Sequence, residues 1–82
     1  MILNITRGHI EVKIGDKVAM VPGEMFRAKN GKTGFGVYLD QIDYWEPKES
    51  KQRITSAETR AIIDDIQAEF NKNDFTLEVD SA

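Results

Sequence analysis

The tripeptide Gly31-Lys32-Thr33 matches the last three residues of a phosphate-binding P-loop. In the full motif, G-x-x-x-x-G-K-[ST], the first glycine would fall at position 26, where the chain has Phe26. A bulky residue there prevents the backbone from curling round a phosphate, and the strand-like sequence GFGVYLD follows where a helix should begin. Asn30-Gly31 instead predicts a hairpin with a type I′ turn between two apolar-alternating runs, because both residues tolerate positive φ.

Side chains able to do acid–base or metal chemistry are few in this chain. There is one histidine, His9, and there is no cysteine. No sequence signature supplies His9 with a partner for proton transfer, so we interpret it as a surface histidine. The acidic run of Asp40, Asp43 and Glu46 lacks the D-x-[DN]-x-[DN]-G spacing of a calcium loop, and a zinc site would have to rely on carboxylates. The sequence therefore predicts no enzyme, no metal site and no cofactor.

The distribution of charge also disfavours nucleic-acid binding. The chain has 14 acidic and 11 basic residues, and the basic residues are scattered through the expected strands instead of grouped on one element. A nucleic-acid binder must neutralise phosphates, usually with a basic patch. Small sheet-based RNA binders also expose aromatic residues, whereas we interpret Phe26 and Phe35 as core residues.

The most informative segment is DQIDYWEPKE, residues 40 to 49. It contains the only tryptophan, Trp45, next to Tyr44 and between Asp43 and Glu46. In a structural interpretation, Trp45 is a core anchor that closes one end of a sheet. In a functional interpretation, an aromatic pair surrounded by carboxylates is a hot spot for a basic protein partner. The acidic neighbours keep the second interpretation open.

The elements that must position this segment begin with short strands in the first forty residues. Apolar residues alternate with polar ones, and turn signals at Gly15-Asp16, Pro22-Gly23 and Asn30-Gly31 separate the runs. This pattern predicts a β-meander of adjacent antiparallel strands. The residues that carry the alternation are Leu3 and Ile5, then Ile10, Val12 and Ile14, then Val18 and Met20, then Phe26 and Ala28, and then Phe35, Val37 and Leu39.

A charged surface loop is expected at residues 47 to 53, followed by a helix from Ser56 to Asn71. Thr55 and Glu58 form a capping box at its start. The apolar stripe at helical spacing consists of Ile62, Ile63, Ile66 and Phe70, with Glu58, Asp65 and Glu69 beside it.

A final strand then carries Phe75, Leu77 and Val79. The expected fold class is α+β: an antiparallel β-meander sheet of about five to six strands, with one helix from the second half of the chain packed on it and a final strand rejoining it. Residues 1 to 82 form a single domain, because a chain of this length supports one modest core.

Composition and charge suggest a globular protein with an acidic second half. The chain is 40% apolar and 30% charged, with a net charge of −3. Residues 1 to 39 carry six basic and three acidic residues, a sum of +3, whereas residues 40 to 82 carry five basic and eleven acidic residues, a sum of −6. The absence of cysteine, of a signal peptide and of a long apolar run predicts a cytoplasmic location. A basic partner would be attracted to the second half.

The order of these segments resembles a known family. The runs ITRGHIEVKI, VPGEMF, GFGVYLDQIDYWEP and ITSAETRAIIDDIQAEF, followed by a final strand, are similar to the family called immunity protein 74. This family is found beside polymorphic and contact-dependent growth-inhibition toxins in bacteria. The more specific parts of the likeness are Gly23-Glu24-Met25, the triplet Trp45-Glu46-Pro47 and the capped helix. Members of the family usually have a second proline soon after the triplet, whereas Lys48 comes next in this chain.

The resemblance implies that the chain binds and neutralises the toxin made by the neighbouring gene. Many such toxins are nucleases, whose clefts are basic because their substrates are polyanions, so an acidic immunity protein would be steered to the cleft and occupy it. The partner is then a protein, not a nucleic acid or a membrane. The predicted partner-binding residues are Tyr38, Asp40, Asp43, Tyr44, Trp45 and Glu46, with Asp65 and Glu69 as a second group.

A second function of a different class fits the same sequence. A small meander without catalytic groups is also typical of a phage- or plasmid-encoded adaptor, or of a subunit of a larger assembly, that adds a strand to a partner sheet. The neighbouring gene distinguishes the two, because a large secreted toxin favours immunity and structural phage genes favour the adaptor.

Overall fold

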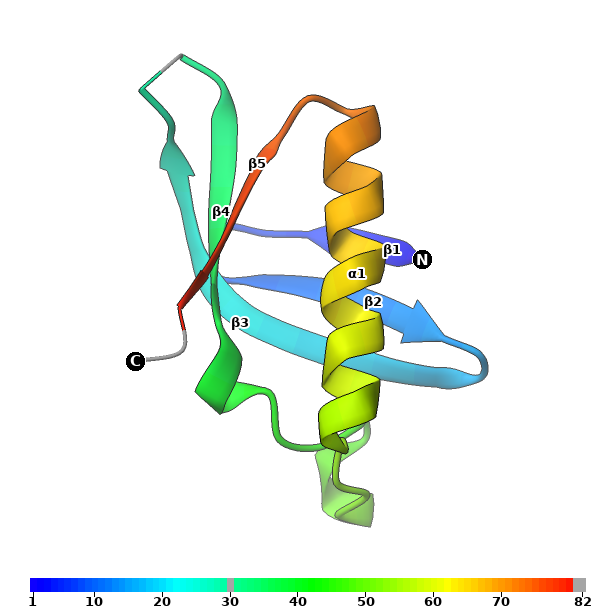
Figure 1. Ribbon diagram of the computed structural model, residues 1–82. Coiled ribbons are helices and arrows are strands. Elements are labelled where there is room, and N and C mark those ends of the chain that lie inside the picture. Colours follow the sequence, from blue (N-terminus) through cyan, green and yellow to red (C-terminus); the bar gives the residue numbers. More distant parts are fainter. Residues whose placement is uncertain (30, 81–82) are drawn as a thin grey trace.

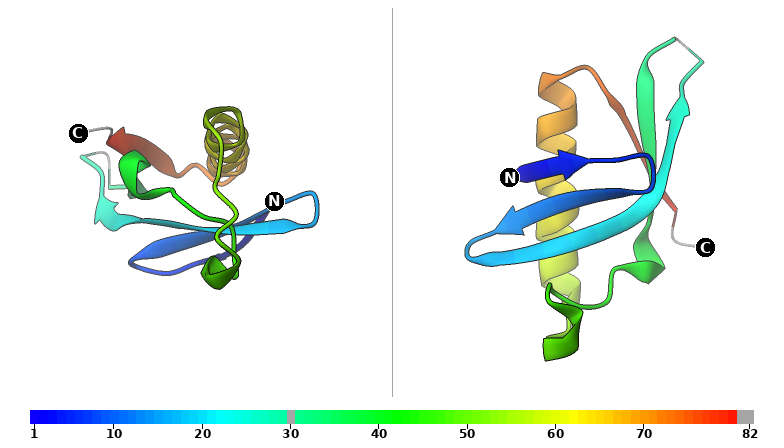
Figure 2. Two further views of the ribbon diagram at one scale, coloured as in Figure 1. Left: turned by 90° about the horizontal axis from the view of Figure 1, so that it is seen from below. Right: turned by 180° about the vertical axis from the view of Figure 1, so that it is seen from behind.

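The computed structural model describes residues 1–29 and 31–80. In this part of the chain, one helix lies across one face of a five-stranded sheet (Figures 1 and 2). The fold class is therefore α+β, as the sequence predicts. The elements, in chain order, are β1 (Ile2–Ile5), β2 (His9–Ile14), β3 (Lys17–Arg27), β4 (Thr33–Tyr38), the short 3-10 helices η1 (Leu39–Gln41) and η2 (Lys48–Ser50), α1 (Ser56–Lys72) and β5 (Thr76–Asp80).

The sheet follows the chain order β1-β2-β3-β4-β5, but the last strand runs parallel to its neighbour. The first four strands form the expected antiparallel meander. Strand β5 returns beside β4 only after the chain has crossed the sheet in α1, and such a helical crossover is the usual connection between parallel neighbours. The sheet is thus mixed and not wholly antiparallel.

Strand β3 is the long central element, and it curves so that each half pairs with a different neighbour (Figure 2). Its first half pairs with β2 as far as Pro22, and its second half pairs with β4 from Gly23 onward. The predicted break at Pro22-Gly23 is therefore wrong. A Cβ on Gly23 would lie 2.1 Å from the backbone oxygen of Gly36, so this glycine allows close approach of two strands and does not mark a turn.

The inward face of β3 differs from the expected one by one residue, and β1 differs from its expected face at Leu3. In the first half of β3 the fully buried side chains are those of Ala19 and Val21, whereas Val18 and Met20 are only half-buried. In β1 an irregular register between Ile2 and Asn4 turns Leu3 outward, with 42% of its surface exposed. A shift of one residue moves every side chain of a strand to the other face, so local alternation alone left these assignments open to error.

The position of Phe26 also differs from the prediction, and this difference affects the candidate functional site. Phe35 lies in the core with 2% exposure, as expected, but Phe26 is half-buried on the opposite face of the sheet. Because β3 is continuous through Pro22, Phe26 falls on the same face as Glu24 and not on the face of Val21. The interpretation of Phe26 as a core residue is wrong.

Helix α1 matches its prediction closely, since it spans Ser56–Lys72. Both halves of the capping box are present: the Glu58 backbone N–H donates to Thr55 Oγ1 at 3.1 Å, and the Thr55 N–H donates to Glu58 Oε1 at 2.9 Å. Ile62, Ile66 and Phe70 are buried against the sheet. The core that they complete also contains Ile10, Val12, Ala19, Val21, Phe35, Val37, Ile42 and Trp45.

The hairpin between β3 and β4 has one loop residue more than a two-residue type I′ turn. The Ala28 N–H donates to the Lys32 oxygen at 2.8 Å and the Gly31 N–H donates to the Ala28 oxygen at 2.9 Å, so Ala28 and Lys32 close the loop. Gly31 has φ of +81°, a conformation that favours glycine. The hairpin itself is confirmed, while Asn30 lies outside the described residues.

Candidate functional site

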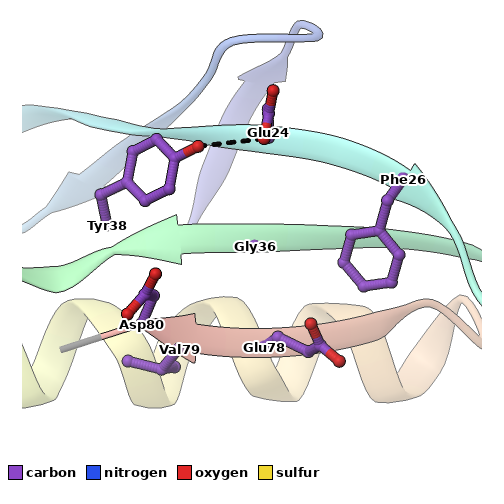
Figure 3. Close-up of a pocket in the computed structure, with 7 residues that line it drawn as sticks. All are labelled: Glu24, Phe26, Gly36, Tyr38, Glu78, Val79 and Asp80. Carbon is purple, nitrogen blue, oxygen red and sulfur yellow. Dashed lines mark hydrogen bonds between the residues drawn. The ribbon is translucent and has the colours of Figure 1, made fainter. Parts of the chain in front are cut away.

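An open groove of about 600 Å³ lies on the sheet face opposite α1, over strands β3, β4 and β5 (Figure 3). The strand register explains how the lining residues come together. Glu24 pairs with Gly36, which pairs in turn with Glu78, and Tyr38 of β4 pairs with Asp80 of β5. Phe26 and Val79 complete the lining. We call this hollow the outer groove.

Missing side chains on β4 create the outer groove. Gly34 and Gly36 both fall on the outer face, and neither contributes a side chain there. The ring of Phe26 covers the first glycine, since a Cβ on Gly34 would lie 2.5 Å from the ring Cζ. A Cβ on Gly36 would meet nothing closer than 3.9 Å, so the space above this residue stays open. Gly36 is the floor of the groove, and Phe26 forms one of its walls.

The electrostatics of the outer groove favour a cation. Glu24, Glu78 and Asp80 contribute carboxylates, and among the described lining residues there is no lysine or arginine. The Tyr38 hydroxyl donates to Glu24 Oε2 at 3.0 Å. This hydrogen bond, followed by partial burial and the charges of Glu24 and Asp80, raises the pKa of Tyr38 above its ordinary value of 10.0. A neutral phenol, an aromatic ring and carboxylates together suit a lysine or arginine side chain.

Of the residues predicted from the sequence to bind a partner, only Tyr38 lies in the outer groove. Trp45 is 2% exposed and belongs to the core. The prediction that Trp45 contacts a partner is therefore corrected, because the buried indole acts as the core anchor of the structural interpretation. The reason is that residue 46 pairs with Val18 of β3, which draws the preceding indole under α1.

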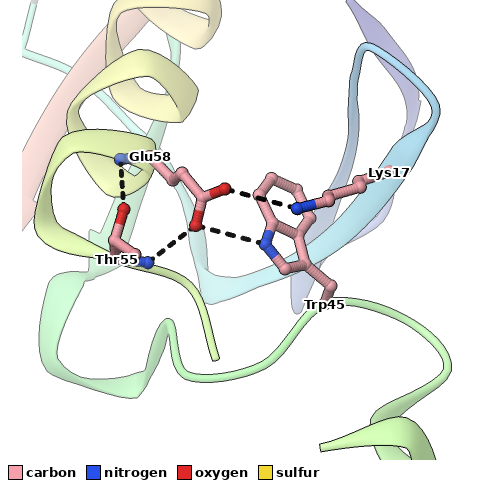
Figure 4. A network of polar contacts seen from close by, with 4 residues as sticks. All are labelled: Lys17, Trp45, Thr55 and Glu58. Atoms are coloured by element: carbon pink, nitrogen blue, oxygen red, sulfur yellow. Dashed lines mark hydrogen bonds and ion pairs between the residues drawn. The ribbon is translucent and has the colours of Figure 1, made fainter. Parts of the chain in front are cut away.

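A polar network fixes Trp45 at the start of α1 (Figure 4). The indole Nε1 donates to Glu58 Oε1 at 3.4 Å, and Lys17 Nζ lies 3.5 Å from Glu58 Oε2 and 5.5 Å from the centre of the tryptophan ring. The backbone N–H of Thr55 is the main cause that lowers the pKa of Glu58, with further contributions from Trp45 and Lys17. The network ties the β2–β3 turn, the loop and the helix together, and its role is structural.

The other predicted residues of the loop group lie at the surface beyond the end of β4. Asp40 is exposed in η1. Asp43 accepts a hydrogen bond from the Tyr44 N–H at 2.7 Å and lies 3.5 Å from Lys48 Nζ. Glu46 Oε2 accepts from the Lys48 N–H at 3.2 Å. Tyr44 is half-buried with the Arg53 guanidinium 5.8 Å from its ring centre.

The two acidic groups predicted from the sequence do not form one surface. Asp65 makes an ion pair with the amino group of Met1, beside β1, and Glu69 lies one turn further along the same helix face. Asp40 belongs to η1, which contacts β5. Because β1 and β5 are the two edges of the sheet, the groups lie toward opposite sides of the molecule (Figure 1).

Sequence reasoning missed six of the seven lining residues, which are Glu24, Phe26, Gly36, Glu78, Val79 and Asp80. A signal for Gly36, Glu78 and Asp80 exists in the alternation Gly34-x-Gly36-x-Tyr38 and Thr76-x-Glu78-x-Asp80, which leaves one face of each strand without large aliphatic side chains. That signal gains meaning only when β5 is known to lie beside β4. No local pattern in the sequence reveals this pairing.

Other chemistry finds little support in the part of the chain that the structure describes. No group of three or more His, Cys, Asp or Glu residues there is arranged to hold a metal ion. The ring of His9 lies with its Nδ1 3.1 Å from Thr6 Oγ1, in the turn between β1 and β2. Among the same residues, no helix has both the length and the apolar character that a membrane crossing requires.

Comparison with known proteins places the chain in a family. No curated protein and no solved structure matches it. The family model described as immunity protein 74 matches residues 2–80, which includes every strand, the helix and the outer groove. The chain therefore belongs to the immunity protein 74 family.

Proposed function

We propose that this protein neutralises a nuclease toxin by binding over its substrate cleft. Membership of an immunity protein family supports toxin neutralisation as the general function. The nuclease activity of the toxin and the occlusion of its cleft are the steps that we add. A nuclease cleft is basic because it binds a polyanion, and an acidic protein is attracted to such a surface.

The observation that supports this proposal best is the composition of the outer groove. It brings three carboxylates from two strands together with the rings of Phe26 and Tyr38 on one face. That combination fits the cationic side chains that line a nuclease cleft, since carboxylates attract them and aromatic rings pack on them after water is displaced. In this proposal the carboxylates increase the association rate constant, and the aromatic rings increase the affinity.

Further contacts are proposed on the loop that follows β4. Asp40, Asp43, Tyr44 and Glu46 lie in this loop, and Asp40 is closest in sequence to the Tyr38 wall of the groove. Asp65 and Glu69 form a separate proposed contact on the helix. Only a large toxin surface could reach both groups, because they lie toward opposite edges of the sheet.

The setting of this activity follows from the same proposal. The protein acts without catalysis, in the cytoplasm of a bacterium that carries a polymorphic toxin system of the contact-dependent growth-inhibition kind. Its role is to protect the producing cell and its siblings from their own toxin. The required partner is a protein, and neither a cofactor nor a nucleic acid takes part.

Co-expression with the toxin of the neighbouring gene tests this function. Protection of a cell that the toxin alone kills, and a stable complex of the purified pair, are the expected results. The association rate constant should fall as salt rises from low to physiological concentration, because screening acts over about 8–10 Å. Failure to protect would contradict the proposal and would favour an adaptor in a larger assembly.

Two sets of charge reversals locate the contact. Reversal of Glu24, Glu78 and Asp80 to lysine should slow association by about tenfold or more, since all three carboxylates of the outer groove change sign. The matched set on the loop, Asp40, Asp43 and Glu46 to lysine, should have a smaller effect. If the loop set alone slows association, the groove is not the centre of the interface.

A further inference from the structure

Strand β5 forms one edge of the sheet. It is the last strand in the sheet order, so one of its long sides faces no other strand in the described chain. An edge strand offers backbone N–H and C=O groups in a row, and a partner segment can pair with them. β5 has five residues, which is enough for a paired segment of about 17 Å.

A second groove lies on the other face of this edge strand. It has a volume of about 590 Å³ and runs between β5 and the first half of α1. Its apolar lining consists of Leu39, Ile42, Ile54, Ile63 and Val79. We call it the inner groove.

The apolar side chains of the inner groove are incompletely covered. Val79 is 44% exposed. Ile63 is only half-buried, although its stripe neighbours Ile62 and Ile66 are fully buried, because it faces this groove and not the sheet. The charged residues on the rim, Arg60 and Asp64, have opposite signs, so the inner groove carries no marked net charge.

The edge strand therefore separates two grooves of different chemistry. Val79 contributes to the lining of both. Glu78 and Asp80 lie toward the acidic outer groove (Figure 3). By the alternation of a strand, Leu77 and Val79 fall on its opposite face. A segment paired with β5 would place its own side chains alternately over the outer and the inner groove.

We propose that the toxin contributes an extended segment that adds to β5 as a sixth strand. Its side chains alternate between lysine or arginine, which enter the outer groove, and leucine, isoleucine or valine, which enter the inner groove. The charge of the outer groove and the bare apolar surface of the inner groove specify this occupant. The inference rests on the proposed function, because it describes how the same partner is held.

Hydrogen exchange of the purified complex with the toxin domain of the neighbouring gene tests the strand addition. Those amides of residues 76–80 that point away from β4 should exchange at least about tenfold more slowly in the complex than in the free protein, because new interstrand hydrogen bonds protect them. The amides of β1, at the other edge of the sheet, serve as the internal control and should change little.

Substitutions on the two faces of β5 test the alternating pattern. Glu78→Lys places a positive charge in the outer groove, and Val79→Lys places one in the inner groove. Each should raise the Kd for the toxin domain by about tenfold or more, equivalent to about 1.4 kcal/mol. The matched control for Glu78→Lys is Asp16→Lys, an equal charge reversal in the exposed β2–β3 turn, and it should change Kd by less than about threefold.

The outcomes separate this inference from the proposed function. A stable complex in which the exchange of residues 76–80 is unchanged would overturn the strand addition but leave toxin neutralisation intact. Equal affinity of the parent and Glu78→Lys proteins would do the same, and this variant should fold because residue 78 is exposed. The absence of any complex would remove both.

Discussion

Replacement of Gly36 by alanine should raise the stability of the protein and weaken its binding to the partner. The new Cβ would lie 3.9 Å from the backbone oxygen of Glu24 and 4.0 Å from Cε1 of Phe26, which are ordinary contact distances. A glycine within a strand costs about 0.5–1 kcal/mol relative to alanine, so the free energy of unfolding should rise by that amount. For a domain of this size the melting temperature should rise by roughly 2–8 °C. Thermal unfolding followed by circular dichroism measures both quantities.

The same substitution should weaken toxin binding, because Gly36 is the floor of the outer groove. A methyl group there removes space that the proposed partner side chain occupies, and Gly36→Val removes more while remaining favourable in a strand. We expect a Kd increase of about tenfold or more for the valine variant, measured by calorimetry, and a smaller increase for alanine.

Two other glycines give matched controls with different expected results. Gly34→Ala would place its Cβ 2.5 Å from the Phe26 ring, which can rotate outward, so its cost should be small. Gly23→Ala would place its Cβ 2.1 Å from a backbone oxygen of β4, so the strands must separate and the loss should be about 3 kcal/mol or more. A Gly36→Ala protein that is less stable than its parent, or a Gly36→Val protein that binds the toxin as tightly, would refute the reasoning.

Three further predictions concern the cap and the titrating groups. Thr55→Ala should lower the free energy of unfolding by about 1 kcal/mol in urea titrations, because it removes the side-chain acceptor of the capping box, whereas Ser56→Ala at the next position should be nearly neutral. The folded pKa of Glu58 lies below its ordinary value of 4.5, so its contribution to stability is present above that pH and is lost as the pH falls through the folded value. The difference in melting temperature between the parent and Glu58→Gln should accordingly shrink between about pH 7 and pH 3. In a protein whose other tyrosine is replaced by phenylalanine, Glu24→Gln should lower the pKa of Tyr38 toward 10.0 in an ultraviolet titration, and an unchanged pKa would show that Glu24 is not its cause.

The helix was predictable because its signals are local. The capping box lies within four residues of sequence, and the apolar stripe repeats at a fixed spacing, so neither depends on the rest of the fold. The observed helix, Ser56–Lys72, extends one residue beyond the predicted end. The β-meander was also predictable from local signals, since turn residues occur between β2 and β3 and between β3 and β4.

The faces of β3 were not predictable from local alternation. This strand has apolar residues on both faces, because Val18 and Met20 as well as Ala19 and Val21 are at least half-buried. The alternation therefore gives no unique inward face, and the choice depends on which neighbours each half of the strand meets. β3 pairs with β2 in its first half and with β4 from Gly23 onward, and only the three-dimensional structure reveals this change of partner.

The candidate site was predictable only in part, for a related reason. Tyr38 was identified from its position before an acidic segment, and it does lie in the outer groove. Trp45 belongs to the same segment, but its indole is buried because Glu46 pairs with Val18 of β3, a residue far from it in sequence. Glu78 and Asp80 reach the groove because β5 pairs with β4 across a helical crossover, a contact between residues about forty positions apart.

The arrangement of β4 shows how one strand serves both stability and recognition. Its inward residues, Phe35 and Val37, are buried under the helix, whereas Gly36 and Tyr38 line the outer groove. Because α1 covers only one face of the sheet, side chains on the outer face can change in size without disturbing the close-packed core. Substitutions in the outer groove can then change the partner without changing the core. Gly23 contributes both to stability and to the shape of the groove, since the close approach of β3 and β4 at this residue holds the groove walls together.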